Sequence, residues 1–220
     1  MSAGEPSRLA SIAIAGPAGN LEGLLQHHAD HTPALAALVL HPHPLYGGTL
    51  HNKVVHRVAS TLHQLGADVL RINFRGVGGS EGHHDRGVGE LEDARAAWRW
   101  LGERYPHARR WLAGFSFGSW IAARLAASEP HVERLVLVAP SVRVSSFEVL
   151  RTCTVPKLIV QGTADDVCPI EFLRAEFPTW AEPRTLIEVD GASHFFDRRL
   201  GALGDALRGA LEGFARGATA

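Results

Sequence analysis

Residues 110–127 read RWLAGFSFGSWIAARLAA, an apolar run that passes through Gly114-Phe115-Ser116-Phe117-Gly118 into a helix-like segment. This is G-x-S-x-G between a strand and a helix, a context that places a serine on a sharp turn. The turn predicts a strained backbone at Ser116 and requires glycine at both flanking positions, where a side chain would collide. The amides that follow Ser116 would then begin a helix, where they can stabilise a developing negative charge.

Short apolar runs alternate with helical periodicity on both sides of this segment. Continuous apolar runs are typical of strands that are buried on both faces, and spacings of three and four are typical of helices. Strand–helix alternation implies right-handed crossovers, so the sequence predicts an α/β fold with a mostly parallel central sheet and helices on both faces. The expected strands are residues 11–15, 21–26, 34–40, 69–74, 110–113, 135–139, 158–161 and 185–189, and the expected helices are residues 54–65, 91–105, 120–127 and 200–214.

The chain shows no internal repeat, low-complexity tract or linker, so we expect one domain over residues 1–220. The first two strands are expected to form a pair joined by the Gly- and Pro-containing turn at residues 16–19. Only 16 residues separate Pro140 from Lys157. They leave room for a loop or a short helix between two strands, and we therefore expect no lid domain.

Composition and charge narrow the range of partners and compartments. The 22 basic and 23 acidic residues give a formal charge of −1, which provides no basic field for nucleic acid or anionic lipid. Cys153 and Cys168 are too few for a disulfide framework, which favours reduced thiols. The N-terminal segment lacks the pattern of a signal peptide, and the longest apolar run, residues 34–40, is too short to span a bilayer. We expect a cytoplasmic protein, and the oligomeric state stays open.

A serine hydroxyl needs a base to become a nucleophile, and the base needs an acid that orients it. In this context the three residues follow in the order Ser, Asp or Glu, His. Asp165 and Asp166 follow the second-last expected strand, and His194 follows the last one and is the only histidine after residue 131. Ligand crevices form at the C-terminal ends of parallel strands, so we expect Ser116, His194 and one of the two aspartates to meet there.

Three motifs in this order resemble the α/β-hydrolase family: G-x-S-x-G, G-x-x-D-x-x-x-P at residues 162–169 and G-x-x-H-F at residues 191–195. The resemblance covers nearly the whole chain. It is closest to small dienelactone-hydrolase-like and esterase-like members that lack a lid and carry HPHP…GG after the third strand. The family pattern puts the acid four residues before Pro169, at Asp165. Asp166 is the alternative, and its ordinary role would be to cap a short helix that starts near Pro169.

The segment at residues 41–49, HPHPLYGGT, follows the third expected strand. In the family this loop supplies the second amide of the oxyanion hole, and the first amide belongs to the residue after the nucleophile, here Phe117. Matching residue by residue puts His43 at the donating position, with Leu45 as the alternative because Pro44 has no N–H. Tyr46, Phe117 and Phe195 are candidates to line an apolar substrate pocket, whereas Phe115 is expected in the core.

A metal site is the competing interpretation of the same loop. His41 and His43 form an H-x-H pair, a common ligand spacing, but no HExxH or CxxC partner accompanies them. The glycine-rich residues 76–82 lack the third glycine of a dinucleotide fingerprint, since Glu81 stands in its place. We therefore expect neither a metal nor a cofactor, and Arg75 in that segment is expected to tie loops together.

The resulting prediction is a serine hydrolase that cleaves small carboxylic esters, lactones or thioesters through an acyl-enzyme. Ser116 would be the nucleophile, His194 the base and Asp165 the orienting acid, with a small-molecule ester as the substrate. Three alternatives stay open: peptide or thioester hydrolysis on the same scaffold, a metal-dependent hydrolase that uses His41 and His43, and a non-catalytic binding protein with this fold.

Overall fold

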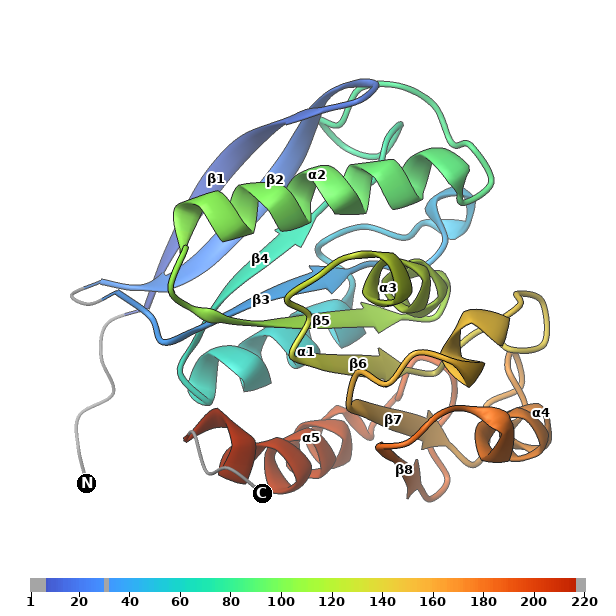
Figure 1. Ribbon diagram of the computed structural model, residues 1–220. Helices are drawn as coiled ribbons and strands as arrows, with labels where there is room; N and C mark the ends of the chain where they lie inside the picture. Colours follow the sequence, from blue (N-terminus) through green and yellow to red (C-terminus); the bar gives the residue numbers. More distant parts are fainter. Residues whose placement is uncertain (1–6, 30–31, 217–220) are drawn as a thin grey trace.

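The computed structural model describes residues 7–29 and 32–216. Eight strands form one sheet, flanked by helices (Figure 1). The strands are β1 (Ser7–Gly16), β2 (Gly19–His28), β3 (Leu35–Leu40), β4 (Ala67–Ile72), β5 (Arg109–Phe115), β6 (Arg134–Val138), β7 (Lys157–Gly162) and β8 (Arg184–Val189). The helices are α1 (Lys53–Gln64), α2 (Val88–Arg104), α3 (Phe117–Ser128), α4 (Ile170–Glu176) and α5 (Leu200–Ala215), with short 3-10 turns η1 (Pro44–Tyr46), η2 (Glu148–Arg151) and η3 (Phe177–Thr179).

The strand order is β1-β2-β4-β3-β5-β6-β7-β8. The six strands from β3 to β8 run parallel, and the β1–β2 hairpin joins the edge of the sheet through an antiparallel pairing of β2 with β4. The predicted α/β fold with a mostly parallel sheet is confirmed. Every element that the sequence predicts is present, with small differences at its ends.

Alternate residues of each central strand face opposite layers of helix. In β3, Ala36, Leu38 and Leu40 pack in the core under α2 and α3. Leu35, Ala37 and Val39 pack in the second core, under α1 and α5. Figure 1 shows α2 and α3 in front of the sheet, with α1 and α5 on the other side. This two-sided burial explains why β3 reads as an unbroken apolar run in the sequence.

Local sequence explains the ends of α1. The Asn52 side chain caps its first turn by accepting from the N–H of Val54 at 2.9 Å. The helix ends before Gly66, whose φ of +95° is the left-handed conformation that glycine adopts at little cost. The chain then returns to the sheet as β4, beside β3.

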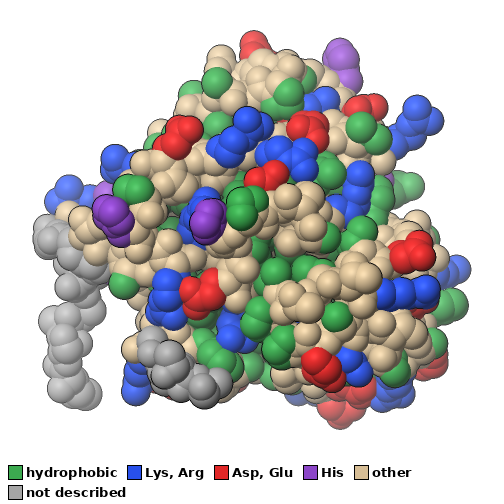
Figure 2. All heavy atoms as spheres, in the orientation of Figure 1, with side chains coloured by type: hydrophobic (Ala, Val, Ile, Leu, Met, Phe, Trp, Pro, Cys, Tyr) green, Lys and Arg blue, Asp and Glu red, His purple; other side chains and the backbone are tan. Residues whose placement is uncertain are grey.

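The connection from β6 to β7 contains only the short turn η2 and no lid domain, as expected. Cys153 and Cys168 are buried free thiols. On the face shown in Figure 2, Lys and Arg side chains are interspersed with Asp and Glu, in keeping with the formal charge of −1. None of the helices in residues 7–29 and 32–216 has the length and apolar character needed to cross a bilayer.

The expected domain, residues 1–220, and the N-terminal segment judged not to be a signal peptide both include residues 1–6. Those residues lie outside the described ranges, and the extent of the domain stays a prediction.

Candidate active site

Ser116 lies on the sharp turn between β5 and α3, at the C-terminal edge of the sheet. Its backbone has φ 54° and ψ −115°, in a region that a residue with a side chain seldom adopts. The Ser116 N–H donates to the carbonyl of Val138 at 2.9 Å, which holds the turn against the end of β6. The strained backbone predicted from the G-x-S-x-G pattern is present.

The glycines on either side of Ser116 are required by close backbone contacts. A Cβ atom on Gly114 would lie 2.2 Å from the carbonyl oxygen of Gly118. A Cβ on Gly118 would lie 2.4 Å from the carbonyl oxygen of Leu40 and 2.5 Å from that of His41. Real Cβ atoms do not approach backbone so closely, so only glycine fits either position.

Ser116, His194 and Asp165 form a hydrogen-bonded line. His194 Nε2 lies 3.0 Å from Ser116 Oγ, and His194 Nδ1 lies 2.8 Å from Asp165 Oδ2. The three residues come from loops that follow β5, β8 and β7, and all are buried, with Ser116 exposing 9% of its surface. In this arrangement Nδ1 donates to the carboxylate, which leaves Nε2 free to accept the serine proton.

The carboxylate of Asp165 is fixed by further donors. Its Oδ1 accepts from the N–H groups of Val167 at 3.0 Å and Cys168 at 2.7 Å, and its Oδ2 accepts from Gln161 Nε2 at 2.9 Å. These bonds orient the carboxylate toward His194. Asp166 is exposed, and the helix that follows has Pro169 at its N-cap with no side-chain cap. The expected capping role of Asp166 is therefore wrong.

Neither the Phe117 N–H nor the His43 N–H has a hydrogen-bond acceptor within the described residues, and the rings of these two residues lie 4.9 Å apart. The Phe117 N–H begins α3, where no intrahelical acceptor exists, and the His43 N–H lies in the loop after β3. The alternative donor, Leu45, uses its N–H to donate to His43 Nδ1 at 3.2 Å. The contacts therefore favour His43 over Leu45 as the second amide that could hold an oxyanion.

His84, which belongs to no sequence motif, also lies in this region. Its ring lies 4.9 Å from that of His43 and 6.1 Å from that of Phe117. Its Nδ1 is 2.6 Å from Oε1 of the buried Glu90, a close contact without good hydrogen-bond alignment. Burial and the neighbouring His84 both lower the pKa of His43, so His43 is neutral beside the site.

Glu90 is an acid in the first turn of α2. Its carboxylate accepts from the N–H groups of Asp85 at 2.9 Å and Gly87 at 2.7 Å, which closes the loop before α2. Arg75 in the preceding glycine-rich segment donates to both carboxylate oxygens of Asp93, at 3.0 and 2.7 Å. Arg75 therefore ties its loop to α2, as expected.

The predicted pocket residues lie at different depths. Phe115 is fully buried in the core, as expected, and Phe117 is 6% exposed. Tyr46 is 86% exposed, and its ring lies 4.8 Å from that of His43. Phe195 is 39% exposed and packs edge-on against His194 at 5.1 Å. Tyr46 and Phe195 thus lie on the rim of the site, and their role as substrate contacts stays a prediction.

The alternative interpretation, a metal site at His41 and His43, is not supported by the surroundings of His41. His41 is fully buried, and its Nε2 accepts from the N–H of Phe74 at 3.0 Å. Burial lowers the pKa of His41 to about 4, so the ring is neutral and acts as a structural acceptor between two loops.

A second group of possible ligands, His28, His63 and Asp68, lies at the N-terminal edge of the parallel strands. Their ligand atoms are within 4.8 Å of one another. However, the rings of His28 and His63 stack face to face at 4.0 Å. Stacked rings cannot both direct a nitrogen lone pair at one ion, so this arrangement does not fit a bound metal.

Comparison with known proteins is consistent with this geometry. A family model described as "Serine aminopeptidase, S33" matches residues 36–152, which include Ser116 and the loop at His43. An α-beta serine hydrolase homologue from Coxiella burnetii superposes with a TM-score of 0.88 at 41% identity, over 92% of this chain and 97% of that one. The chain belongs to the α/β-hydrolase superfamily. It is a serine hydrolase by family and fold.

Two further relatives of this hydrolase have similar length. A Xanthomonas campestris protein, described as an α/β serine hydrolase without a lid, has 34% identity and a TM-score of 0.88, over 95% of this chain and 96% of that one. An uncharacterised protein of Rickettsia prowazekii is 40% identical over 84% of this chain and 81% of its own. The family model ends before Asp165 and His194, so the placement of these two side chains rests on the hydrogen bonds described above.

Proposed function

We propose that this hydrolase is a carboxylesterase that cleaves small esters, lactones or thioesters through an acyl-enzyme. The observation that carries the proposal is the unbroken line from Asp165 through His194 to Ser116, with contacts of 2.8 and 3.0 Å. A neutral imidazole oriented by a buried carboxylate can accept a serine proton, which is what makes a hydroxyl nucleophilic.

In the acylation step, Ser116 Oγ attacks the carbonyl carbon while His194 Nε2 takes the hydroxyl proton. The resulting imidazolium is stabilised by Asp165, which stays ionised. The negative charge that develops on the carbonyl oxygen would be held by the N–H groups of Phe117 and His43. The tetrahedral intermediate collapses, the bond to the leaving oxygen or sulfur breaks, and His194 returns the proton to the leaving group.

Deacylation repeats these steps with water. His194 removes a proton from a water molecule that attacks the acyl carbon, the same amides hold the oxyanion, and His194 protonates Ser116 Oγ as it leaves. The products are the carboxylic acid and the regenerated hydroxyl. Every proton moves between His194 and an oxygen or sulfur atom, so the scheme requires no cofactor.

The carboxylates near Ser116 favour ester over aminopeptidase chemistry. An aminopeptidase must hold the N-terminal ammonium of its substrate, which requires an acceptor beside the nucleophile. Asp165 is occupied by His194 and three further donors, and Glu90 is occupied by two backbone N–H groups. Both carboxylates are thus already engaged by donors of this chain, which supports an uncharged reacting end of the substrate.

The test combines activity with active-site labelling. The wild-type protein is expected to hydrolyse p-nitrophenyl acetate and butyrate and to react stoichiometrically with a fluorophosphonate probe. Ser116→Ala should lose both, by about 10⁴-fold or more in kcat, with an unchanged melting temperature. Ser128→Ala, at the exposed far end of α3, is the matched control.

The same panel separates the alternatives. If the wild-type protein does not hydrolyse the esters but cleaves an amino-acid p-nitroanilide, the esterase proposal is wrong and the protein is a peptidase. Absence of labelling in folded protein would favour a binding protein with this fold, because a serine without a working base reacts poorly.

A further inference from the structure

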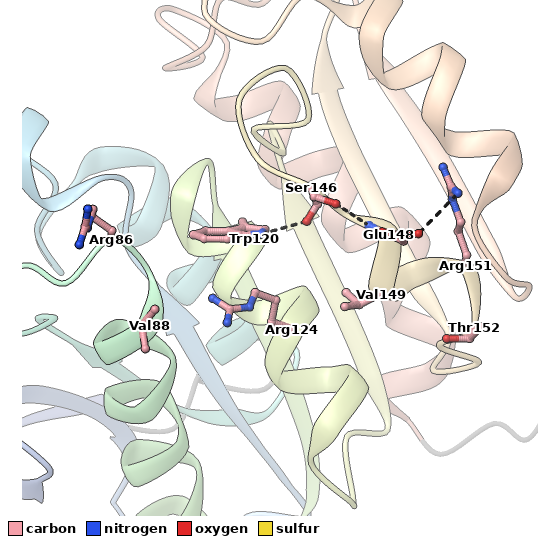
Figure 3. A pocket seen from close by; sticks show the side chains of 9 residues that line it. All are labelled: Arg86, Val88, Trp120, Arg124, Ser146, Glu148, Val149, Arg151 and Thr152. Carbon is pink, nitrogen blue, oxygen red and sulfur yellow. Dashed lines mark hydrogen bonds and ion pairs between the residues drawn. The ribbon is translucent and has the colours of Figure 1, made fainter.

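A groove of about 690 Å³ opens beside the first turns of α3 (Figure 3). One side comes from the start of α2, the other from η2 and the residues that flank it. Figure 3 shows the Trp120 side chain between these two sides. No step of the proposed mechanism uses the residues that line this groove, yet it adjoins the turn that carries Ser116.

The apolar part of the groove consists of Trp120, Val88 and Val149. Trp120 Nε1 donates to the carbonyl of Ser146 at 2.9 Å, which fixes the plane of the indole. Val88 is 63% exposed, an unusual position for a large aliphatic side chain in water. These side chains form a preformed surface against which an alkyl chain can pack.

Three arginines, Arg86, Arg124 and Arg151, surround this apolar surface, with Glu148 as the only acid among the lining residues. Arg124 stacks over the Trp120 ring at 4.9 Å and donates to the carbonyl of Gly87 at 2.8 Å. Within the described residues, neither Arg86 nor Arg124 forms an ion pair with a carboxylate.

The third arginine is only weakly neutralised. Arg151 lies 3.9 Å from Glu148, and both side chains are about half exposed or more. An exposed ion pair of this kind contributes little stabilising free energy, so Arg151 can exchange Glu148 for a better acceptor. The groove therefore carries a net positive charge beside an apolar wall, and guanidinium groups match carboxylate and phosphate oxygens in pairs.

The groove is within reach of an acyl group bound to Ser116. Trp120 follows Ser116 by four residues on the same helix, which corresponds to a rise of about 6 Å. The Trp120 N–H lies 3.4 Å from the Ser116 carbonyl, and the Trp120 ring lies 5.7 Å from that of Phe117, the proposed oxyanion donor. Trp120 thus links the turn that carries Ser116 to the groove.

The position of His194 indicates which part of the substrate would enter. The leaving group must depart beside His194 Nε2, and Phe115, whose ring lies 5.1 Å from that of His194, belongs to the core under α1 and α5. Trp120 and Val149 pack against the opposite core, under α2 and α3. The groove and the leaving group thus lie toward different sides of the sheet, which leaves the groove to the acyl part.

We propose that this groove is an acyl subsite for an anionic end, so that the preferred substrates are esters of acyl chains that terminate in a carboxylate or a comparable oxyanion. The proposal rests on the esterase function proposed above and specifies its substrate class. The alkyl segment packs on Trp120, Val88 and Val149, and the terminal oxyanion is bound by Arg86 and Arg124, with Arg151 able to join them.

The test compares matched pairs of p-nitrophenyl esters of equal chain length. Hydrogen adipate and hydrogen suberate esters are compared with hexanoate and octanoate, and hydrogen succinate is the short-chain reference. The ratio of kcat/KM for the anionic ester to that for its neutral partner is expected to exceed one for adipate or suberate but not for succinate. Because the interaction is ionic, the ratio should fall as sodium chloride is raised from 0.05 to 0.5 M, roughly a threefold decrease in screening length.

Variants identify the groups responsible. Arg86→Gln and Arg124→Gln should each lower the anionic-to-neutral ratio about tenfold, the scale of one charge-assisted hydrogen bond. Arg208→Gln, on α5 at the other face of the sheet, is the matched control and should leave the ratio unchanged. Because Arg86 is exposed, its replacement keeps the test valid even if Arg124→Gln reduces stability. Inhibition of neutral-ester hydrolysis by hexanoate and by hexyl phosphate then distinguishes a carboxylate from a phosphate preference.

The outcomes are distinct. If neutral esters are hydrolysed while the ratio stays at or below one for every chain length, the subsite is overturned and the esterase function stands. An elevated ratio that survives both Arg→Gln replacements also overturns the subsite. If neither type of ester is hydrolysed and Ser116 is not labelled, the esterase function fails, and the subsite fails with it.

Discussion

Two histidine–aspartate pairs lie at opposite edges of the same sheet. At the C-terminal edge, His194 Nδ1 is 2.8 Å from Asp165; at the N-terminal edge, His28 Nδ1 is 3.0 Å from Asp68. Both aspartates are almost fully buried, and both accept several hydrogen bonds. The contact between imidazole and carboxylate is thus nearly the same in the two places.

The pairs differ in what the histidine meets on its other side. His194 presents Nε2 to the hydroxyl of Ser116, which a strained turn holds in place. His28 instead stacks on the ring of His63, and Tyr105 donates to Asp68 at 2.7 Å. A histidine–aspartate pair therefore becomes chemically useful only where the backbone brings a nucleophile to it, and otherwise it fastens strands and loops together.

The largest expected difference between the two pairs is in catalysis. Asp165→Asn keeps the size of the side chain but removes the charge that stabilises the His194 imidazolium and selects its tautomer. The expected result is a decrease in kcat for p-nitrophenyl butyrate of about 10³- to 10⁴-fold. Steady-state kinetics at pH 7.5 measure it.

Asp68→Asn is the matched control at the other edge. It should leave kcat unchanged and lower the free energy of unfolding by about 1–3 kcal/mol. The reason is that the side-chain amide of asparagine has one acceptor oxygen, whereas the Asp68 carboxylate accepts from His28 on one oxygen and from Tyr105 on the other. Thermal unfolding measures this loss. Equal losses of activity in Asp165→Asn and Asp68→Asn would contradict the distinction drawn between the pairs.

A smaller loss of activity is expected when the strained turn is disturbed. An alanine Cβ at residue 118 would meet the carbonyl oxygens of Leu40 and His41 at 2.4 and 2.5 Å, so the turn must shift. Displacement of a nucleophile on the scale of 1 Å can cost about 10²-fold in rate, and we expect a loss of that size for Gly118→Ala. Gly209→Ala in α5, where the added methyl meets nothing within 4 Å, should keep full activity and unfold at the same or a higher temperature.

The smallest expected effect is a change in stability with pH that arises from His63, at the N-terminal edge of the parallel strands. Burial lowers the pKa of His63 from its ordinary 6.5; the bond to the Ala67 carbonyl and the charge of Asp68 oppose this, while His27 and His28 add to it. The unfolded chain thus binds a proton at this residue more readily than the native chain does. The stability that His63 contributes is complete above pH 6.5 and is lost as the pH falls toward the native-state value.

His63→Asn should therefore reduce the loss of stability between pH 7.5 and pH 5. Denaturant unfolding at the two pH values measures it. His107→Asn, at an exposed position, should behave as wild type. An identical loss of stability in wild type and His63→Asn would show that the buried ring is not the source of the acid sensitivity.

The sequence was sufficient for the fold because the decisive features are local. Buried strands such as β3 read as short apolar runs, and the glycine at residue 66 marks the end of α1. The ends of β1 and β2 were underestimated: they were expected at residues 11–15 and 21–26, yet they extend over Ser7–Gly16 and Gly19–His28. The outer residues of this hairpin are exposed or polar, so pairing between the strands, rather than an apolar pattern, determines their length.

Within the site, the placement of Ser116, Asp165 and His194 could be inferred because each follows a recognisable strand within a motif. The surroundings could not. His84 reaches His43 and Phe117 through the fold of a glycine-rich loop, and Arg86, Arg124 and Arg151 line one groove from three segments that share no motif. Such clusters depend on loop paths and helix orientation, which a single sequence does not encode as a local pattern.

The contact of Gly118 with the carbonyls of Leu40 and His41 joins the start of α3 directly to the loop that carries His43. The Phe117 and His43 amides, which we propose to hold the oxyanion, are thus carried by segments in direct contact, so a shift of this turn is expected to displace both. We therefore expect substrate range to depend on the surrounding segments, chiefly the exposed rim at Tyr46 and Phe195 and the arginine-lined side of α3.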